Sequence, residues 1–170
     1  MKIENFSNFS LDESYLKSNF APLYHFTYDW VLESILEDNT LKTGWIENDF
    51  FDKKIKIISF TRERNLDLSH YKNDLNIIIE LDKNKMILNG YKFYPYDFFI
   101  QTKKEKFTKS DLRRKQPFEF EEASIKDIVN IDKYLLSVTF LNDSIFNSYK
   151  SVNILKSKKI PIYENNTRVF

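Results

Sequence analysis

The sequence predicts a single α+β domain in which strands outnumber helices. Three runs are rich in β-forming residues and stop at polar residues, namely Pro22–Thr27, Lys54–Thr61 and Leu75–Leu81. A stripe of apolar residues at helical spacing follows the first run. No internal repeat and no Pro/Gly/Ser linker divides the 170 residues, so we expect one domain spanning 1–170.

The helix is expected to begin after Thr27, whose hydroxyl suits the N-cap position, and to run to about Asp38. Asp29 would lie in its first turn, where negative charge suits the helix dipole. Its apolar stripe consists of Val31, Leu32, Ile35 and Leu36. Asn39 is expected to end this helix.

The other elements follow from the same patterns. We expect a short lead-in helix at 11–20, an edge segment at 41–44, a polar loop at 62–74 and a short helix or turn at 82–90. An aromatic extended segment at 91–100 precedes a basic, irregular stretch at 102–116. Strands are expected at 118–125 and 134–141, with a loop or short helix between them, and near 160–163.

Composition excludes several kinds of site. The chain contains only 2 Gly, so no Gly-rich phosphate loop can be written, and it contains no Cys for disulfides, thiol catalysis or Cys-ligated zinc. With 2 His, a His-rich metal site is not expected, and no metal is predicted. No apolar run approaches the roughly 18–20 residues of a membrane span. We therefore expect a soluble, cytoplasmic protein without a membrane partner.

His25 stands where a strand meets a helix, beside amide groups that suit a polyanionic ligand. The simpler interpretation is a half-buried histidine bonded to the backbone. Ser59 and Thr61 end an apolar strand and point to one face, opposite Phe60. They bind a ligand or simply bond to neighbouring strands. Arg62 is a surface residue or a bidentate phosphate ligand.

Three glutamates follow Phe118. In a strand Glu119 and Glu121 share a face, whereas Glu122 points away. Two carboxylates on one face raise the pKa of one of them and suit acid–base or oxocarbenium chemistry. The alternative is an acidic, solvated strand or helix start.

A basic run at 103–115 lies just before these glutamates. It is either a solvated face or a surface that attracts phosphates, on which Phe107 would stack against a base. The candidate substrate-binding residues are Lys103, Lys104, Lys106, Phe107, Arg113 and Arg114.

The order of these features resembles the ADP-ribosyltransferase-like superfamily, which includes DarT-type enzymes, poly(ADP-ribose) polymerases and tRNA 2′-phosphotransferases. Leu23–Thr27 (LYHFT) with the helix after it resembles the superfamily's opening motif, and Ser59–Thr61 (SFT) is similar to its second motif. Glu119–Glu121 (EFE) is similar to the "E-x-E" third motif. The resemblance covers about 22–140.

This resemblance implies a split β-sheet core with a helix after the first strand, and NAD bound as a substrate. It implies that Glu121, with Glu119 beside it, is catalytic. The residues that it places at NAD are Tyr24, His25, Thr27, Ser59, Thr61 and Arg62. The expected activity is mono-ADP-ribosyl transfer to a macromolecule, nucleic acid before protein, in a phage–host or toxin-type conflict.

Two alternatives use the same fold. One is an RNA 2′-phosphotransferase-like enzyme with basic residues at its centre, and the other is a non-catalytic module that binds a nucleotide or blocks a defence protein. The tyrosine that stacks on nicotinamide in part of the superfamily has no obvious counterpart near Ser59. Tyr71, Tyr94 and Phe60 are the candidates to replace it.

Overall fold

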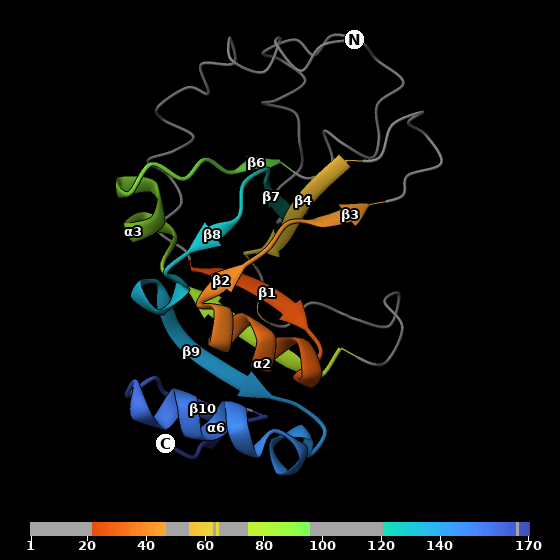
Figure 1. Cartoon of the computed structure of the whole chain (residues 1–170), viewed down its shortest axis with the longest axis vertical. Coiled ribbons are helices and arrows are strands. Elements are labelled where there is room, and N and C mark those ends of the chain that lie inside the picture. Colours follow the sequence, from red (N-terminus) through yellow and green to blue (C-terminus); the bar gives the residue numbers. More distant parts are fainter. Residues whose placement is uncertain (1–21, 47–54, 63, 65–74, 96–120, 166) are drawn as a thin grey trace, which may run out of the picture.

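The computed structural model describes residues 22–46, 55–62, 64, 75–95, 121–165 and 167–170. Nine strands of this part form one sheet in the order β11-β10-β9-β5-β1-β4-β7-β6, with β3 paired to β4 beside this path (Figure 1). Every pairing in the described sheet is antiparallel except that of β9 with β10. The fold is therefore α+β with a mostly antiparallel sheet, as the sequence predicts at this level.

The strands of this sheet are β1 (Leu23–Thr27), β3 (Gly44–Ile46), β4 (Ile55–Thr61), β5 (Ile77–Leu81), β6 (Tyr94–Pro95), β7 (Glu121–Ser124), β9 (Leu135–Phe140), β10 (Ile162–Glu164) and β11 (Thr167–Arg168). A separate two-stranded sheet pairs β2 (Thr40–Leu41) with β8 (Ile128–Val129). The helices are α2 (Asp29–Asp38), α3 (Lys83–Leu88) and α6 (Tyr149–Ser157), with 3-10 turns at Ile131–Lys133 and Ser144–Asn147.

Helix α2 forms as its apolar stripe predicts, and it buries Leu32, Ile35 and Leu36. Asn39 ends it in the left-handed conformation that asparagine tolerates well. The predicted cap is wrong, because Thr27 belongs to β1 and is buried there. The residue at the N-cap is Tyr28, and Asn76 accepts a hydrogen bond from the Asp29 amide through its side-chain oxygen.

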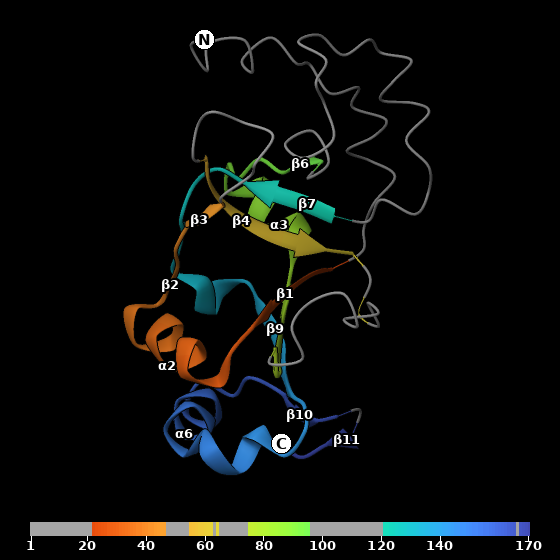
Figure 2. The same cartoon turned by 90° about the vertical axis from the view of Figure 1, so that its right-hand side faces the viewer.

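Helix α6 is not among the predicted elements. Its sequence, YKSVNILKS, contains several residues of modest helix propensity, and only Ser151 and Leu155 are buried. α6 lies beside α2 on the same face of the sheet (Figures 1 and 2). It connects β9 to β10, the parallel pair, which needs a crossover connection of this kind.

The core lies between the sheet and these two helices. Alternate residues of neighbouring strands point into it, and Ile79, Val138 and Ile162 are fully buried in register with one another. Leu155 of α6 joins the same cluster, so the core extends past residue 140. In the described part of the chain, no helix is long and apolar enough to cross a membrane.

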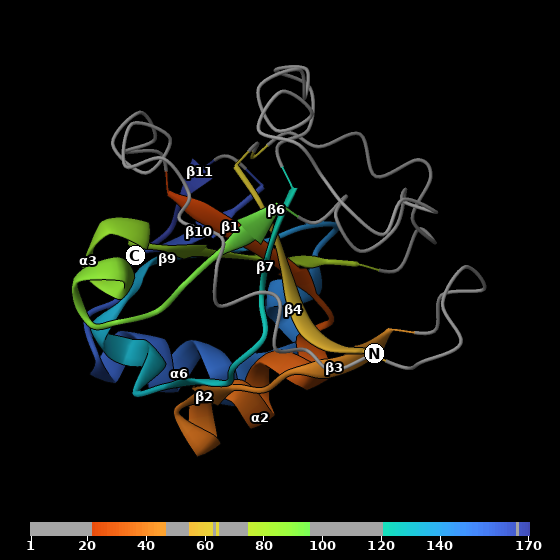
Figure 3. The same cartoon turned by 90° about the horizontal axis from the view of Figure 1, so that it is seen from above.

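One edge of β4 changes its partner along its length. β1 pairs with it at Thr61, whereas β3 pairs with it at Ile55–Ile57. Figure 3, seen from above, shows β3 running beside one end of β4. Ile58–Phe60 lie between the two pairings, and this opening in the sheet positions the candidate site.

Candidate functional site

The described residues of the three predicted motifs lie on neighbouring strands, β1, β4 and β7, with Glu121 as the described residue of the third motif. Thr61 pairs with Tyr24 on one side and with Glu121 on the other, so these three positions form one row across the sheet. Phe60 pairs with Glu122 and contacts the ring of His25, at 5.8 Å between centroids, in the next row. Adjacent rows of a strand alternate between the two faces of the sheet, and Phe60 and Glu122 belong to the same row.

His25 occupies the opening between β1 and β4. Its Nδ1 lies 2.9 Å from the carbonyl oxygen of Ser59. A carbonyl oxygen can only accept, so Nδ1 carries the proton and donates this bond. The imidazole thus satisfies a backbone group at the point where β4 changes partners. This contact matches the simpler interpretation of His25, a histidine bonded to the backbone.

Burial lowers the pKa of His25 below its ordinary value of 6.5, and the bond to Ser59 opposes this effect less strongly. The ring is therefore neutral at pH 7. With Nδ1 protonated, Nε2 is an acceptor. Among the described residues, none bonds to Nε2. His25 can accordingly accept a hydrogen bond from a ligand hydroxyl or amide.

A cavity of about 360 Å³ lies beside His25. Helix α2 forms one wall, and the residues that follow it, 40–45, form another. Ile57, Ile58 and Ser59 of β4 close the third side. Its volume is at the lower end of the range for small-molecule sites, roughly 300–1,000 Å³.

Two polar contacts restrain the segment that follows α2, and Asp38 and Lys42 of the first also line the cavity. Lys42 donates to Asp38 at 2.5 Å, and this bond raises the pKa of Lys42. Asp127 accepts hydrogen bonds from both the amide and the hydroxyl of Thr43, at 2.7 and 2.8 Å, which lower its pKa. These pairs fix the segment between α2 and β3 that walls the cavity.

Glu122 is the centre of a buried ion cluster. Only 3% of its surface is exposed, and its Oε1 lies 2.6 Å from Lys83 Nζ and 3.2 Å from Arg62 Nε. Lys83, in the first turn of α3, is also buried. A solvated acidic strand is therefore the wrong description of Glu122. Its two cations neutralise the charge that would otherwise be costly to bury.

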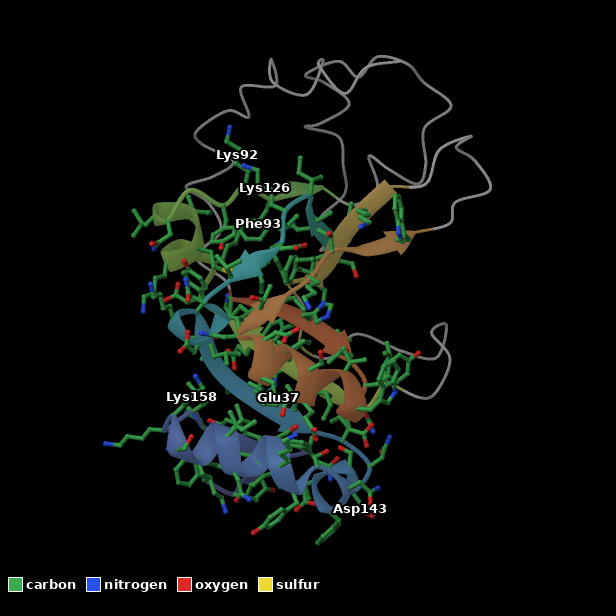
Figure 4. The ribbon with its side chains drawn as sticks, in the orientation of Figure 1. Glu37, Lys92, Phe93, Lys126, Asp143 and Lys158 are labelled. Carbon is green, nitrogen blue, oxygen red and sulfur yellow. The ribbon has the colours of Figure 1, made fainter. Side chains whose placement is uncertain are left out.

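Sequence reasoning missed this role of Glu122, although a signal existed. In the pattern FEFEE, Phe118, Phe120 and Glu122 fall on one face of a strand. A glutamate that continues an apolar face needs a buried cation, which the alternation alone indicates. Phe93, which follows α3 and is labelled in Figure 4, packs edge-on against Phe60, with 5.6 Å between the ring centroids.

The remaining predicted site residues are distributed around this region. Tyr24 and Thr61 are buried, whereas Ser59 is exposed and lines the cavity. Burial, followed by the nearby carboxylate of Glu80, raises the pKa of Tyr24. Glu119, the basic run at 103–115 and Tyr71 lie outside the described residues.

A second polar cluster, not predicted, lies on the face of the sheet that carries Tyr24. The hydroxyl of Ser137 donates to Glu80 at 2.5 Å, and Arg64 donates to Thr139 at 3.1 Å. Arg64 also lies 5.4 Å from the ring centre of Tyr163. These contacts provide hydrogen-bond partners for polar side chains on the sheet face formed by β1, β5 and β9.

The chemistry available at the cavity is that of hydrogen bonding and stacking. Within the described ranges, no group of three or more His, Asp or Glu is arranged to hold a metal ion.

No protein-family model matches the chain, and no curated protein matches it.

Proposed function

We propose that the chain is an NAD-dependent mono-ADP-ribosyltransferase. The observation that carries this proposal is the placement of His25, Ser59–Thr61 and Glu121 on three adjacent strands, with a neutral histidine facing a cavity. These are the three motifs on which the resemblance to the superfamily rests. We propose that the opening between β1 and β4 corresponds to the split sheet of that superfamily.

In the proposed reaction, NAD enters the cavity and His25 Nε2 accepts a hydrogen bond from a ribose hydroxyl. The bond between nicotinamide and the ribose breaks, nicotinamide leaves with the bonding electrons, and a nucleophile of the acceptor bonds to the same ribose carbon. A carboxylate near the developing positive charge stabilises this transition state.

We assign that carboxylate to Glu121 rather than to Glu122. The charge of Glu122 is already neutralised by Lys83 and Arg62, in a site that excludes water. A group held in this way stabilises the fold but has little negative charge to offer a substrate. Glu121 begins β7 beside the end of β4, in register with Thr61.

The test is release of nicotinamide from NAD by the purified protein and two matched variants. Glu121→Gln should abolish release and leave the free energy of unfolding nearly unchanged. Glu122→Gln should lower that free energy by about 3–5 kcal/mol, because it leaves buried cations without their counter-ion. Wild-type release by Glu121→Gln would contradict the assignment.

A non-catalytic nucleotide-binding module is the second candidate. Two contacts favour it, the hydrogen bond from His25 to the Ser59 carbonyl and the ion pair of Glu122 with Lys83. Both stabilise the fold, and neither requires a catalytic role for these residues. This function predicts that NAD binds, as measured by calorimetry, while no nicotinamide is released. The first candidate predicts both.

For the acceptor we propose nucleic acid, on the basis of the basic run at 103–115. Replacing Lys103, Lys104, Lys106 and Lys109 with Gln should reduce transfer to the acceptor and spare hydrolysis of NAD. Transfer should also slow steeply as salt is added, since each neutralised phosphate releases counter-ions. Unchanged transfer by the quadruple variant would exclude this acceptor surface.

A further inference from the structure

The cavity beside His25 has an aromatic wall that none of the three motifs includes. Trp45 of β3 lines it, and 60% of the surface of this residue is exposed. Single exposed apolar residues are common on proteins, so exposure alone indicates nothing. The position of Trp45 at a cavity that also contains an available hydrogen-bond acceptor makes it a candidate ligand contact.

The indole ring is held in place by its neighbours. β3 pairs with β4 so that Trp45 stands opposite Lys56, whose Nζ lies 4.8 Å from the ring centre. This cation–π contact covers one face of the ring and restrains its orientation. A ring fixed on a strand loses little conformational entropy when a ligand stacks on it.

The groups at the cavity define the chemistry of a ligand. A flat indole suits the face of a heteroaromatic ring, since bases stack on aromatic side chains. Nε2 of His25 accepts from a hydroxyl, and the hydroxyls of Ser34 and Thr40 belong to lining residues. A ring joined to a group with several hydroxyls, as in a nucleoside, combines these features in about 360 Å³.

We infer that Trp45 is the stacking surface for the heteroaromatic base of the nucleotide that enters this cavity. The inference rests on the proposed function in that it names a contact of the proposed substrate. NAD contains two such rings, adenine and nicotinamide, and both have the required chemistry.

The chain offers a direct readout, because Trp30 and Trp45 are its 2 tryptophans. Trp30 lies in the first turn of α2, is 71% exposed and stacks on Tyr28, and it is not a lining residue of the cavity. Trp30→Phe therefore leaves Trp45 as the sole indole reporter. Trp45→Phe is the matched control, in which only Trp30 reports.

The full-length variants would be titrated with NAD, AMP and nicotinamide mononucleotide while tryptophan fluorescence is followed. We expect NAD to quench the emission of Trp30→Phe and to leave that of Trp45→Phe unchanged. Trp45→Ala should weaken NAD binding by roughly ten- to a hundredfold in calorimetry. Quenching by AMP assigns the site to adenine, and quenching by nicotinamide mononucleotide assigns it to nicotinamide.

The two proposals fail in different ways. If NAD binds to Trp30→Phe without a change in fluorescence and Trp45→Ala binds as the wild type does, the inference is overturned and the proposed function stands. If AMP quenches Trp45 but NAD is not cleaved, the inference stands and the proposed transferase activity is overturned. If none of the three ligands binds in calorimetry, both are overturned. Circular dichroism establishes that each variant is folded.

Discussion

At the scale of single residues, His25 combines a structural and a chemical property. Its Nδ1 proton satisfies the Ser59 carbonyl where β4 changes partners, and this bond selects the tautomer that leaves Nε2 as an acceptor. Burial lowers the pKa of the ring, so the acceptor persists at neutral pH. The hydrogen bond that satisfies the Ser59 carbonyl therefore also leaves Nε2 of His25 able to accept a hydrogen bond from a ligand.

The lowered pKa of His25 predicts a pH dependence of stability. As the pH falls below 6.5, the unfolded chain takes up a proton that the folded chain does not. Stability should therefore fall between 6.5 and the lower, folded-state pKa, and should change no further through this group below that value. His25→Asn keeps a donor for Ser59 but does not titrate, so it should show a smaller loss in this window.

Urea denaturation at a series of pH values measures this effect, and the difference between wild type and variant removes the contributions of other groups. His70→Asn is the matched control, because it removes the second histidine and keeps His25. If His25→Asn loses as much stability as the wild type over this window, His25 is not the group responsible.

The sequence made His25 and the glutamates candidates, but it did not predict the partners of Glu122. Lys83 is 39 positions away, and the two residues meet only because α3 follows β5 while β7 pairs with β4. Residues so far apart in the sequence leave no local pattern that would predict their contact. Trp45 was missed for a similar reason, since its place at the cavity depends on the pairing of β3 with β4.

At the scale of elements, the short helix α3 positions Lys83 against Glu122. It has only six residues, too few to be stable as an isolated helix in water, and it carries Lys83 in its first turn. Asp82 caps it by accepting a hydrogen bond from the Lys85 amide at 2.9 Å. The cap thus helps to hold Lys83 against Glu122.

Removing this cap should cost measurable stability. Asp82→Ala leaves the Lys85 amide without its partner and is expected to lower the free energy of unfolding by about 1 kcal/mol. Asp82→Asn keeps a side-chain acceptor and should cost much less. Chemical denaturation of both variants measures the difference, and equal losses would show that the capping bond is not the cause.

Strands were easier to predict than helices in this chain. β1, β4, β5 and β9 contain dense runs of β-branched and aromatic residues, which local propensity detects. Most of α6 is exposed or half-buried, so its helical state depends on packing against α2 and on the crossover from β9 to β10. Tertiary context of that kind is not readable from nine residues.

At the scale of the whole molecule, the last part of the chain completes the core that the first part begins. α6 contacts α2 through Lys150, which forms ion pairs with Glu33 and Glu37 at 2.8 and 2.5 Å. These carboxylates raise the pKa of Lys150 well above its ordinary value. The pairs are exposed and therefore screened by salt, so the apolar contacts beneath them must provide most of the cohesion.

Those apolar contacts predict that α6 is essential to stability although it lies outside the region of resemblance. Leu155 is fully buried in the same cluster as Leu32 and Val138. Leu155→Ala removes apolar contacts and leaves a cavity, and it should lower the free energy of unfolding by about 2–5 kcal/mol. Phe146→Ala is the matched control, because Phe146 is 78% exposed and its loss should cost no more than about 0.5 kcal/mol. Denaturation followed by circular dichroism measures both variants. If Leu155→Ala were as stable as Phe146→Ala, residues 22–140 would hold a core that does not need α6, and the packing of α6 on the sheet would be incidental.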